Sequence, residues 1–175
     1  MSTLAKVNDA TLRRLLGYCT LAKAVLAINA ASAATVKTTN AISYIADGIF
    51  LSKAALSAQS IAVTHGLTGL AVANGTPAYV QPISTTVYYL LCVDASGNIA
   101  VVQGGYSGQV VTLPAGISLT SQGEVPEVPV GFTPFGLMKV VTNASTTFTP
   151  GTTALDAAGV TVTYYDLAEV PSVAP

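Results

Sequence analysis

Charged side chains are scarce in this 175-residue chain. Asp, Glu, Lys and Arg together make up 9% of the residues, against roughly 25% in an ordinary soluble domain. The formal net charge is only -1, so electrostatic repulsion between copies is weak. Because hydrophobic residues account for 51%, we expect a protein that buries much of its surface against copies of itself or against a larger assembly. A very well-packed monomer is the alternative.

Long apolar runs are also missing. No stretch approaches the roughly 18 uncharged apolar residues that a membrane-spanning helix needs. Arg13 and Arg14 precede an apolar run from Leu15 to Ala31, which superficially matches a secretory leader. Lys23 interrupts that run, so we interpret it as part of the fold. The sequence therefore predicts no membrane partner.

Side chains suited to catalysis or metal binding are few. His65 is the single histidine, and Cys19 and Cys92 are the two cysteines, both in apolar contexts typical of buried small hydrophobes. A Ser-His-Asp or Cys-His arrangement would have to use His65, a loop residue beside Gly66 that we expect to face solvent. A transition-metal site needs more ligands than these. We therefore predict that the protein is not an enzyme, with no catalytic residue, no metal, no cofactor and no small-molecule substrate.

The few charges are divided between the two ends of the chain. Residues 1–53 hold six cations and two carboxylates, a net of +4, whereas residues 54–175 hold one cation and six carboxylates, a net of -5. One interpretation is a basic amino-terminal arm that docks on an acidic surface, and the other is a solvated helix. The cations are sparse and lack interleaved aromatic side chains, so nucleic acid is not an expected partner.

An amino-terminal helix is predicted over residues 9–29. Asn8 or Asp9 can cap it, and the residues that follow are rich in Ala, Leu and Lys, with no proline. Helical spacing places five residues on one apolar stripe, namely Leu12, Leu15, Cys19, Ala22 and Leu26. Such a stripe can pack on its own domain or join a bundle around a symmetry axis.

From residue 41 the apolar period changes from helical to alternating. A hairpin is predicted over residues 42–53, since Asp47-Gly48 supplies the positive backbone torsions of a tight turn. A second hairpin is predicted over residues 85–103, around a turn at 94–97. Further strands are predicted over residues 59–64, 135–142 and 160–167, while residues 104–134 are expected to be mostly loop with short edge-like pieces. This pattern favours a mainly β fold, an antiparallel β-sandwich or barrel preceded by the helix.

The predicted organisation is a helical arm at residues 1–38, a β-rich domain at residues 39–169 and an extended tail at residues 170–175. Two pairs of adjacent tyrosines occur within predicted strands, so one ring of each pair should lie on either face of a sheet. Half-buried packing and an interface anchor are equally open for them. The candidate interface residues are Leu12, Leu15, Cys19, Leu26, Tyr88, Tyr89, Tyr164 and Tyr165.

Three segments of the β-rich domain, together with the hairpin at 42–53, resemble sequences from tailed double-stranded-DNA bacteriophage particles. They are Val87 to Ile99 (VYYLLCVDASGNI), Pro129 to Val140 (PVGFTPFGLMKV) and Phe148 to Thr153 (FTPGTT). The resemblance implies a virion structural protein assembled in the host cytoplasm. The first hypothesis is a homotrimeric capsid decoration (cement) protein that stabilises the head and contacts the major capsid protein or another virion protein. The alternative is a head- or tail-fibre or adaptor component that binds a host receptor or glycan. The resemblance carries over no functional residue, and the candidate surface for this alternative is the loop at 104–109, which we expect to be exposed and which bears Gly, Ser and Tyr106.

Overall fold

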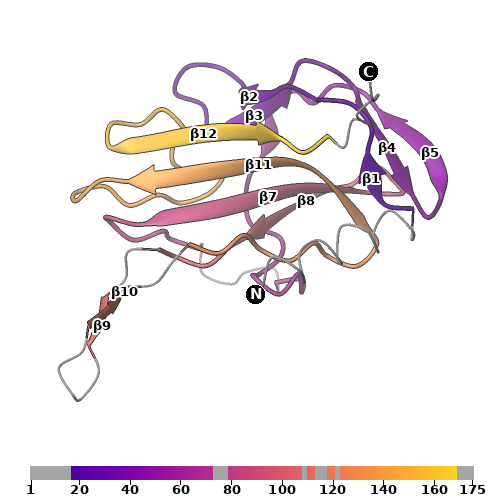
Figure 1. Ribbon diagram of the computed structural model, residues 1–175. Coiled ribbons are helices and arrows are strands. Elements are labelled where there is room, and N and C mark those ends of the chain that lie inside the picture. The colour runs from indigo at the N-terminus through magenta and orange to yellow at the C-terminus, as the bar shows by residue number, and fades with distance from the viewer. Residues whose placement is uncertain (1–16, 73–78, 108–109, 113–117, 121–122, 169–175) are drawn as a thin grey trace, which may run out of the picture.

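The computed structural model describes residues 17–72, 79–107, 110–112, 118–120 and 123–168. Within these ranges every regular element is a β-strand, and the strands pair antiparallel throughout (Figure 1). The strands are β1 Cys19–Thr20, β2 Leu26–Ile28, β3 Thr35–Thr38, β4 Ile42–Ala46, β5 Ile49–Lys53, β6 Gln59–Ser60, β7 Thr86–Asp94, β8 Ile99–Gln103, β9 Val110–Thr112, β10 Ser118–Thr120, β11 Phe132–Thr142 and β12 Val160–Asp166. The predicted mainly β, antiparallel class is confirmed. In the part of the chain that the structure describes, no helical stretch has the length and hydrophobicity that a bilayer crossing requires.

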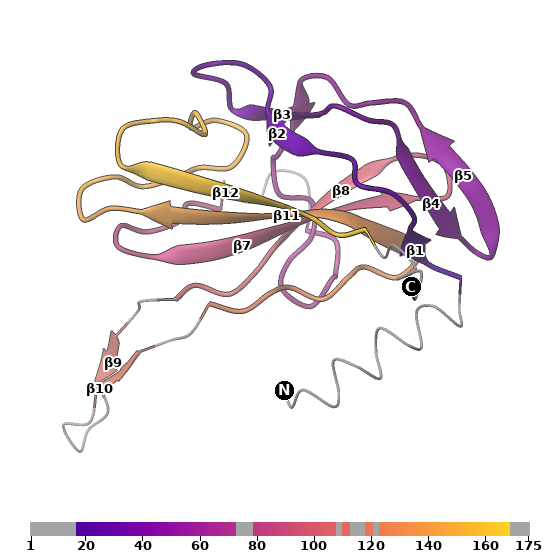
Figure 2. The same cartoon turned by 45° about the horizontal axis from the view of Figure 1, so that its top comes forward.

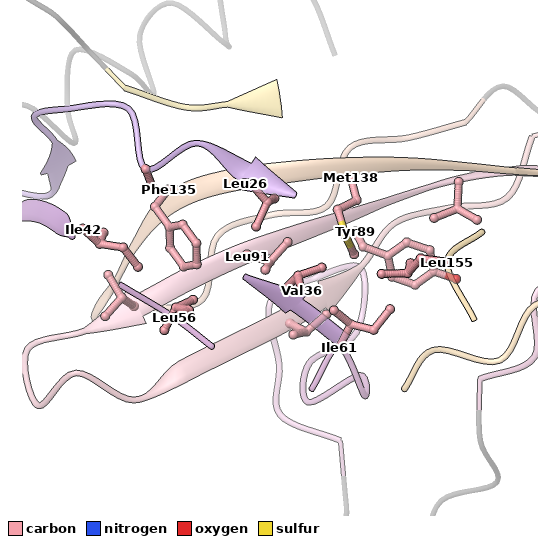
Figure 3. Close-up of a cluster of buried hydrophobic side chains, with 14 of the residues drawn as sticks. Leu26, Val36, Ile42, Leu56, Ile61, Tyr89, Leu91, Phe135, Met138 and Leu155 are labelled. Atoms are coloured by element: carbon pink, nitrogen blue, oxygen red, sulfur yellow. The ribbon is translucent and has the colours of Figure 1, made fainter. Parts of the chain in front are cut away.

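The largest sheet has four strands in the order β12-β11-β7-β8. Two three-stranded sheets, β1-β4-β5 and β2-β3-β6, cover one of its faces (Figure 1). Side chains from both layers meet in one core, which gives a sandwich-like arrangement. Figure 3 shows its centre, formed by Leu26, Val36, Ile42, Leu56, Ile61, Tyr89, Leu91, Phe135, Met138 and Leu155.

Strand β7 is buried on both faces. Alternate residues such as Tyr89 and Leu91 enter the main core, whereas Leu90 and Cys92 belong to a second cluster on the opposite face of the sheet. The loop around Val128 covers this second cluster, so neither face of β7 is left to water at its carboxyl end. A strand covered on both sides needs apolar residues at every position, which explains the continuous run from Tyr88 to Val93.

A β-bulge in β11 changes which residues face the core. The pairing with β7 shifts between Pro134 and Gly136, so Phe135 is an additional residue in β11. Without the bulge, the two-residue period would send either Thr133 or Met138 outward. With it, Thr133, Phe135 and Met138 are all fully buried. The bulge therefore lets one strand of 11 residues contribute to the core along its whole length.

Both predicted hairpins are confirmed. Asp47 and Gly48, between β4 and β5, have φ angles of 51° and 74°, the positive values that a tight hairpin turn needs. Between β7 and β8, the Asp94 carboxylate accepts hydrogen bonds from the backbone N–H groups of Ser96 and Asn98 at 2.9 and 2.8 Å. This side chain satisfies turn donors that have no partner in the sheet. The predicted strands at the carboxyl end correspond to β11 and β12, whereas the one predicted over residues 59–64 is limited to β6.

The predicted helix at residues 9–29 is wrong from Tyr18 onward, and residues 9–16 lie outside the described ranges. β1 and β2 occupy this segment, so the part of the predicted arm from residue 17 to residue 38 belongs to the β structure. Gly17 has a φ of 78° and lies against the β4–β5 turn, where an added Cβ would come within 2.6 Å of the Gly48 nitrogen. Leu26 is buried against the large sheet. Burial of such apolar residues in β-strands overrides the weak helical preference of an Ala- and Leu-rich segment.

Replacing Val25 by asparagine should stabilise the protein. Val25 joins β1 to β2 with a φ of 57°, and its side chain is 42% exposed. A β-branched residue is strained in this left-handed conformation, whereas asparagine tolerates it, so we expect the free energy of unfolding to rise by about 1 kcal/mol. Urea denaturation measures the change. Val80→Asn is the matched control, because Val80 is 48% exposed without a positive φ; an equal gain in both variants would contradict the strain argument.

Candidate functional site

The paired tyrosines divide between the two faces of the large sheet, as predicted. The register aligns Tyr164 with Met138 and Met138 with Tyr89, so both tyrosines lie on the face that packs in the core. Tyr165 pairs with Leu137 on the opposite face, and Tyr88 pairs with Lys139 there. Because directly paired residues share a face, Tyr88 and Tyr165 are on one side of the sheet and Tyr89 and Tyr164 on the other.

The candidate interface residues therefore have different environments. Tyr89 is fully buried and Leu26 is 6% exposed, so both are core residues that can influence an interface only indirectly. Cys19 in β1 and Tyr164 in β12 are half-buried. Tyr165 is 43% exposed and is the most accessible of the tyrosines in the two pairs. Leu12 and Leu15 lie outside the described residues.

The outward face of β11 and β12 is mostly polar and aromatic. Thr161, Thr163 and Tyr165 are exposed along β12, and Lys139 is half-buried beside them on β11. This region, here called the tyrosine face, extends to Tyr88 through its pairing with Lys139. Hydroxyl groups and aromatic rings at low charge density are typical of the surfaces that bind other proteins.

Sequence patterns missed several large apolar side chains that the structure exposes. Ile49 and Phe50, at the start of β5, are 62% and 64% exposed. Leu70 and Val130, in two loops, are 72% and 99% exposed. Strict alternation would have exposed only one of Ile49 and Phe50; two consecutive apolar residues directly after an Asp-Gly turn were the available signal. Ile49 and Phe50 are adjacent in the sequence, so among these four residues they form the one consecutive exposed pair.

A groove of about 350 Å³ opens beside strand β12. It is lined by Ile28, Leu155, Asp156, Val160, Thr161, Val162 and Tyr164. The wall at Asp156 is fixed, because its carboxylate accepts hydrogen bonds from the Ser32 N–H at 2.9 and 3.0 Å. Burial, with a smaller effect of the Asp156 charge, raises the pKa of Tyr164 to about 12. The groove thus presents a mainly apolar lining with a neutral tyrosine at physiological pH.

His65 is half-buried rather than solvent-facing. Its ring packs edge-on against Phe132, with ring centroids 5.5 Å apart, and its Nδ1 lies 2.9 Å from the Thr64 hydroxyl oxygen. Its backbone bridges to Val102, so the loop that carries it covers the β8 edge of the large sheet. The Thr64 hydroxyl is also bonded to the backbone of Val101, donating to its carbonyl at 3.2 Å and accepting from its N–H at 2.9 Å. His65 therefore has a structural explanation as a loop residue packed on the sheet.

His65 should make stability depend on pH. Burial lowers its pKa from the ordinary 6.5, so protonation is less favourable in the folded than in the unfolded chain. Its contribution to stability is complete above pH 6.5 and is lost as the pH falls through the lower folded-state pKa. Because His65 is the single histidine, NMR titration of its ring Cε1–H should give a midpoint below 6.5. A midpoint at or above that value would contradict the packing described for the ring.

The carboxylates of Glu124 and Glu127 and the thiols of Cys19 and Cys92 do not form a reactive cluster with His65. Glu124 and Glu127 are both exposed, and Glu124 is held by backbone pairing with Gly105. Cys19 is half-buried and Cys92 is buried, and they do not form a disulfide with each other. Among the described residues, no cluster of three or more His, Cys, Asp or Glu side chains could hold a metal ion.

The chain matches no protein-family model, no curated protein and no solved structure.

Proposed function

We propose that the protein is a structural subunit of a tailed-bacteriophage particle, a homotrimeric decoration protein on the capsid head. The observation that carries the proposal is the combination of a 9% content of charged residues with large apolar side chains at the surface. Exposed apolar area is favourable to remove from water, and few charges oppose the approach of another copy. The sequence resemblance to phage-particle segments gives the proposal its biological setting.

The proposed contacts fall on the described surfaces rather than on the core. The tyrosine face and the apolar side chains at Ile49, Phe50 and Val130 are accessible. Between them, these two surfaces serve contact between copies and docking on the major capsid protein. The first 16 residues remain part of the proposal as a basic segment for docking, since they carry Lys6, Arg13 and Arg14 against Asp9.

The fibre alternative gains no support from its candidate loop. The Tyr106 ring packs against the main core, and its hydroxyl accepts a hydrogen bond of 2.8 Å from Gln103 Nε2. A glycan platform needs an aromatic face that is open to the sugar. The Tyr106 ring is instead half-buried and packed on the core, so we retain the decoration role.

The copy number and position of the protein in purified particles test the proposal. Quantitative mass spectrometry together with electron microscopy should find many copies distributed over the head. A few copies at a single vertex would favour the fibre or adaptor role, and absence from particles would overturn both. Removing residues 1–16, which precede the first described strand, should reduce incorporation into particles relative to the full-length chain.

A further inference from the structure

Strands β9 and β10 form a hairpin that projects from the rest of the molecule (Figure 2). They pair only with each other among the described residues, with Val111 opposite Leu119 in the register. The segment from Gly104 to Gly123 contains no charged residue. An isolated two-stranded hairpin is marginally stable in water, and strand edges without charges are prone to pair with other strands. Such a hairpin gains stability when a further strand pairs with it.

Strand β12 forms one edge of the large sheet, at the other end of the strand order from β8, and offers a strand to which the hairpin can pair. Just beyond the two ends of β12, Leu167 N–H donates to Phe135 O and Asn143 N–H donates to Gly159 O. Antiparallel pairing alternates, so the odd-numbered residues of β12 bond to β11. The N–H and C=O groups of Val162 and Tyr164 therefore point away from the sheet. Within the described residues, no backbone hydrogen bond is formed by these outward groups.

The groove described above lies directly beside these outward groups. Val162 and Tyr164 contribute to its lining, together with Ile28 from β2. A strand added at this edge would form backbone hydrogen bonds with β12 and place alternate side chains over the groove. Main-chain pairing combined with pockets for alternate side chains is the general form of recognition by strand addition.

We propose that the β9–β10 hairpin of one copy adds to the open edge of β12 in the next copy. A second copy is the favoured occupant because, among the described residues, this chain supplies both a hairpin and a sheet edge that pair with no further strand. The hairpin follows β8, which lies at the edge of the sheet opposite β12, so one chain cannot join its own two parts (Figures 1 and 2). Such a head-to-tail contact can close into a ring. This inference rests on the proposed function and specifies how the subunits of the homotrimer associate.

Two variants remove one half of the contact each. Val162→Pro removes an outward N–H, and proline is tolerated in an edge strand at such a position. Replacing residues 108–122 by Asn-Gly removes the hairpin; Ser107 and Gly123 are close enough to be joined, since a Cβ added at Gly123 would lie 3.3 Å from Ser107 Cβ. Val162→Thr, which keeps the N–H and the branched shape, is the matched control. Val162→Lys is a second edge variant should the proline variant fail to fold.

Sedimentation velocity of the full-length chain, the variants and their mixture tests the inference. Each edge or hairpin variant should be a folded monomer, with its self-association weakened by on the order of 100-fold or more, while Val162→Thr assembles like the wild type. An equimolar mixture of the two variants should form a 1:1 dimer and nothing larger, because each retains the half that the other lacks.

The contradicting results separate the inference from the proposed function. A wild-type oligomer that persists in either variant, or variants that are monomeric but fail to form the mixed dimer, would overturn the strand-addition contact while leaving a self-assembling subunit intact. A monomeric wild type would overturn both. Variants that keep the wild-type oligomer but no longer bind purified capsids would show that the hairpin and edge serve a different protein, which also contradicts a contact between copies.

Discussion

Replacing Phe135 by alanine should lower the free energy of unfolding by about 4 kcal/mol, the usual cost of a large cavity in a core. Phe135 is the additional residue of the β11 bulge and is fully buried between the large sheet and the covering strands (Figure 3). Its neighbours Leu26 and Ile42 come from the other layer. Collapse of the layers around the cavity is limited because the Phe135 carbonyl also accepts a hydrogen bond from Leu167 N–H at 3.1 Å.

Denaturant unfolding of Phe135→Ala checks this prediction. Phe50→Ala removes the same ring from a position that is 64% exposed, so it should change the stability by less than about 0.5 kcal/mol. Comparable losses in the two variants would show that the bulge does not place Phe135 in the core.

Replacing Gln81 by leucine should cost about 3 kcal/mol, since it leaves several buried polar groups without a partner. Gln81 is fully buried, and its side-chain amide donates to the carbonyls of Thr85 and Val140, both at 3.1 Å. Its Oε1 accepts from the Tyr89 hydroxyl at 3.3 Å. Burial, with a smaller effect of Tyr106, raises the pKa of Tyr89, so this hydroxyl remains a neutral donor.

A double-mutant cycle with Tyr89→Phe tests the Gln81 network directly. The single Tyr89→Phe change leaves Gln81 Oε1 without its donor, while Gln81→Leu leaves the tyrosine hydroxyl without its acceptor. The double variant removes both groups, so its loss of stability should be smaller than the sum of the two single losses. Additive losses would indicate that the two side chains do not interact.

The strands that sequence reasoning located share a local signal. Asp47-Gly48 and the turn at Asp94 determine where two hairpins reverse, and β12 shows a simple alternation of exposed residues with buried or half-buried ones. For the paired tyrosines, the period of two predicted the division between faces. Which ring of each pair enters the core depends on which face of the large sheet the two smaller sheets cover. The sequence of a single strand does not contain that information.

The errors also have physical causes. The Ala- and Leu-rich segment after Gly17 has helical composition, but Leu26 is buried as a strand residue and Val25 adopts a left-handed conformation that interrupts any helix. The burial of His65 depends on Phe132, a residue distant in sequence. The exposed edge of β12 and its groove depend on how two layers meet. Packing between residues that are distant in the chain leaves no periodic pattern in the sequence.

The mass of the full-length protein in solution tests the central claim most directly, because that claim is that a charge-poor β-sandwich-like subunit associates with itself. Light scattering at micromolar concentration should give one discrete homo-oligomer, a trimer, that persists in high salt since few charges contribute to its contacts. A monodisperse monomer under the same conditions would contradict the account.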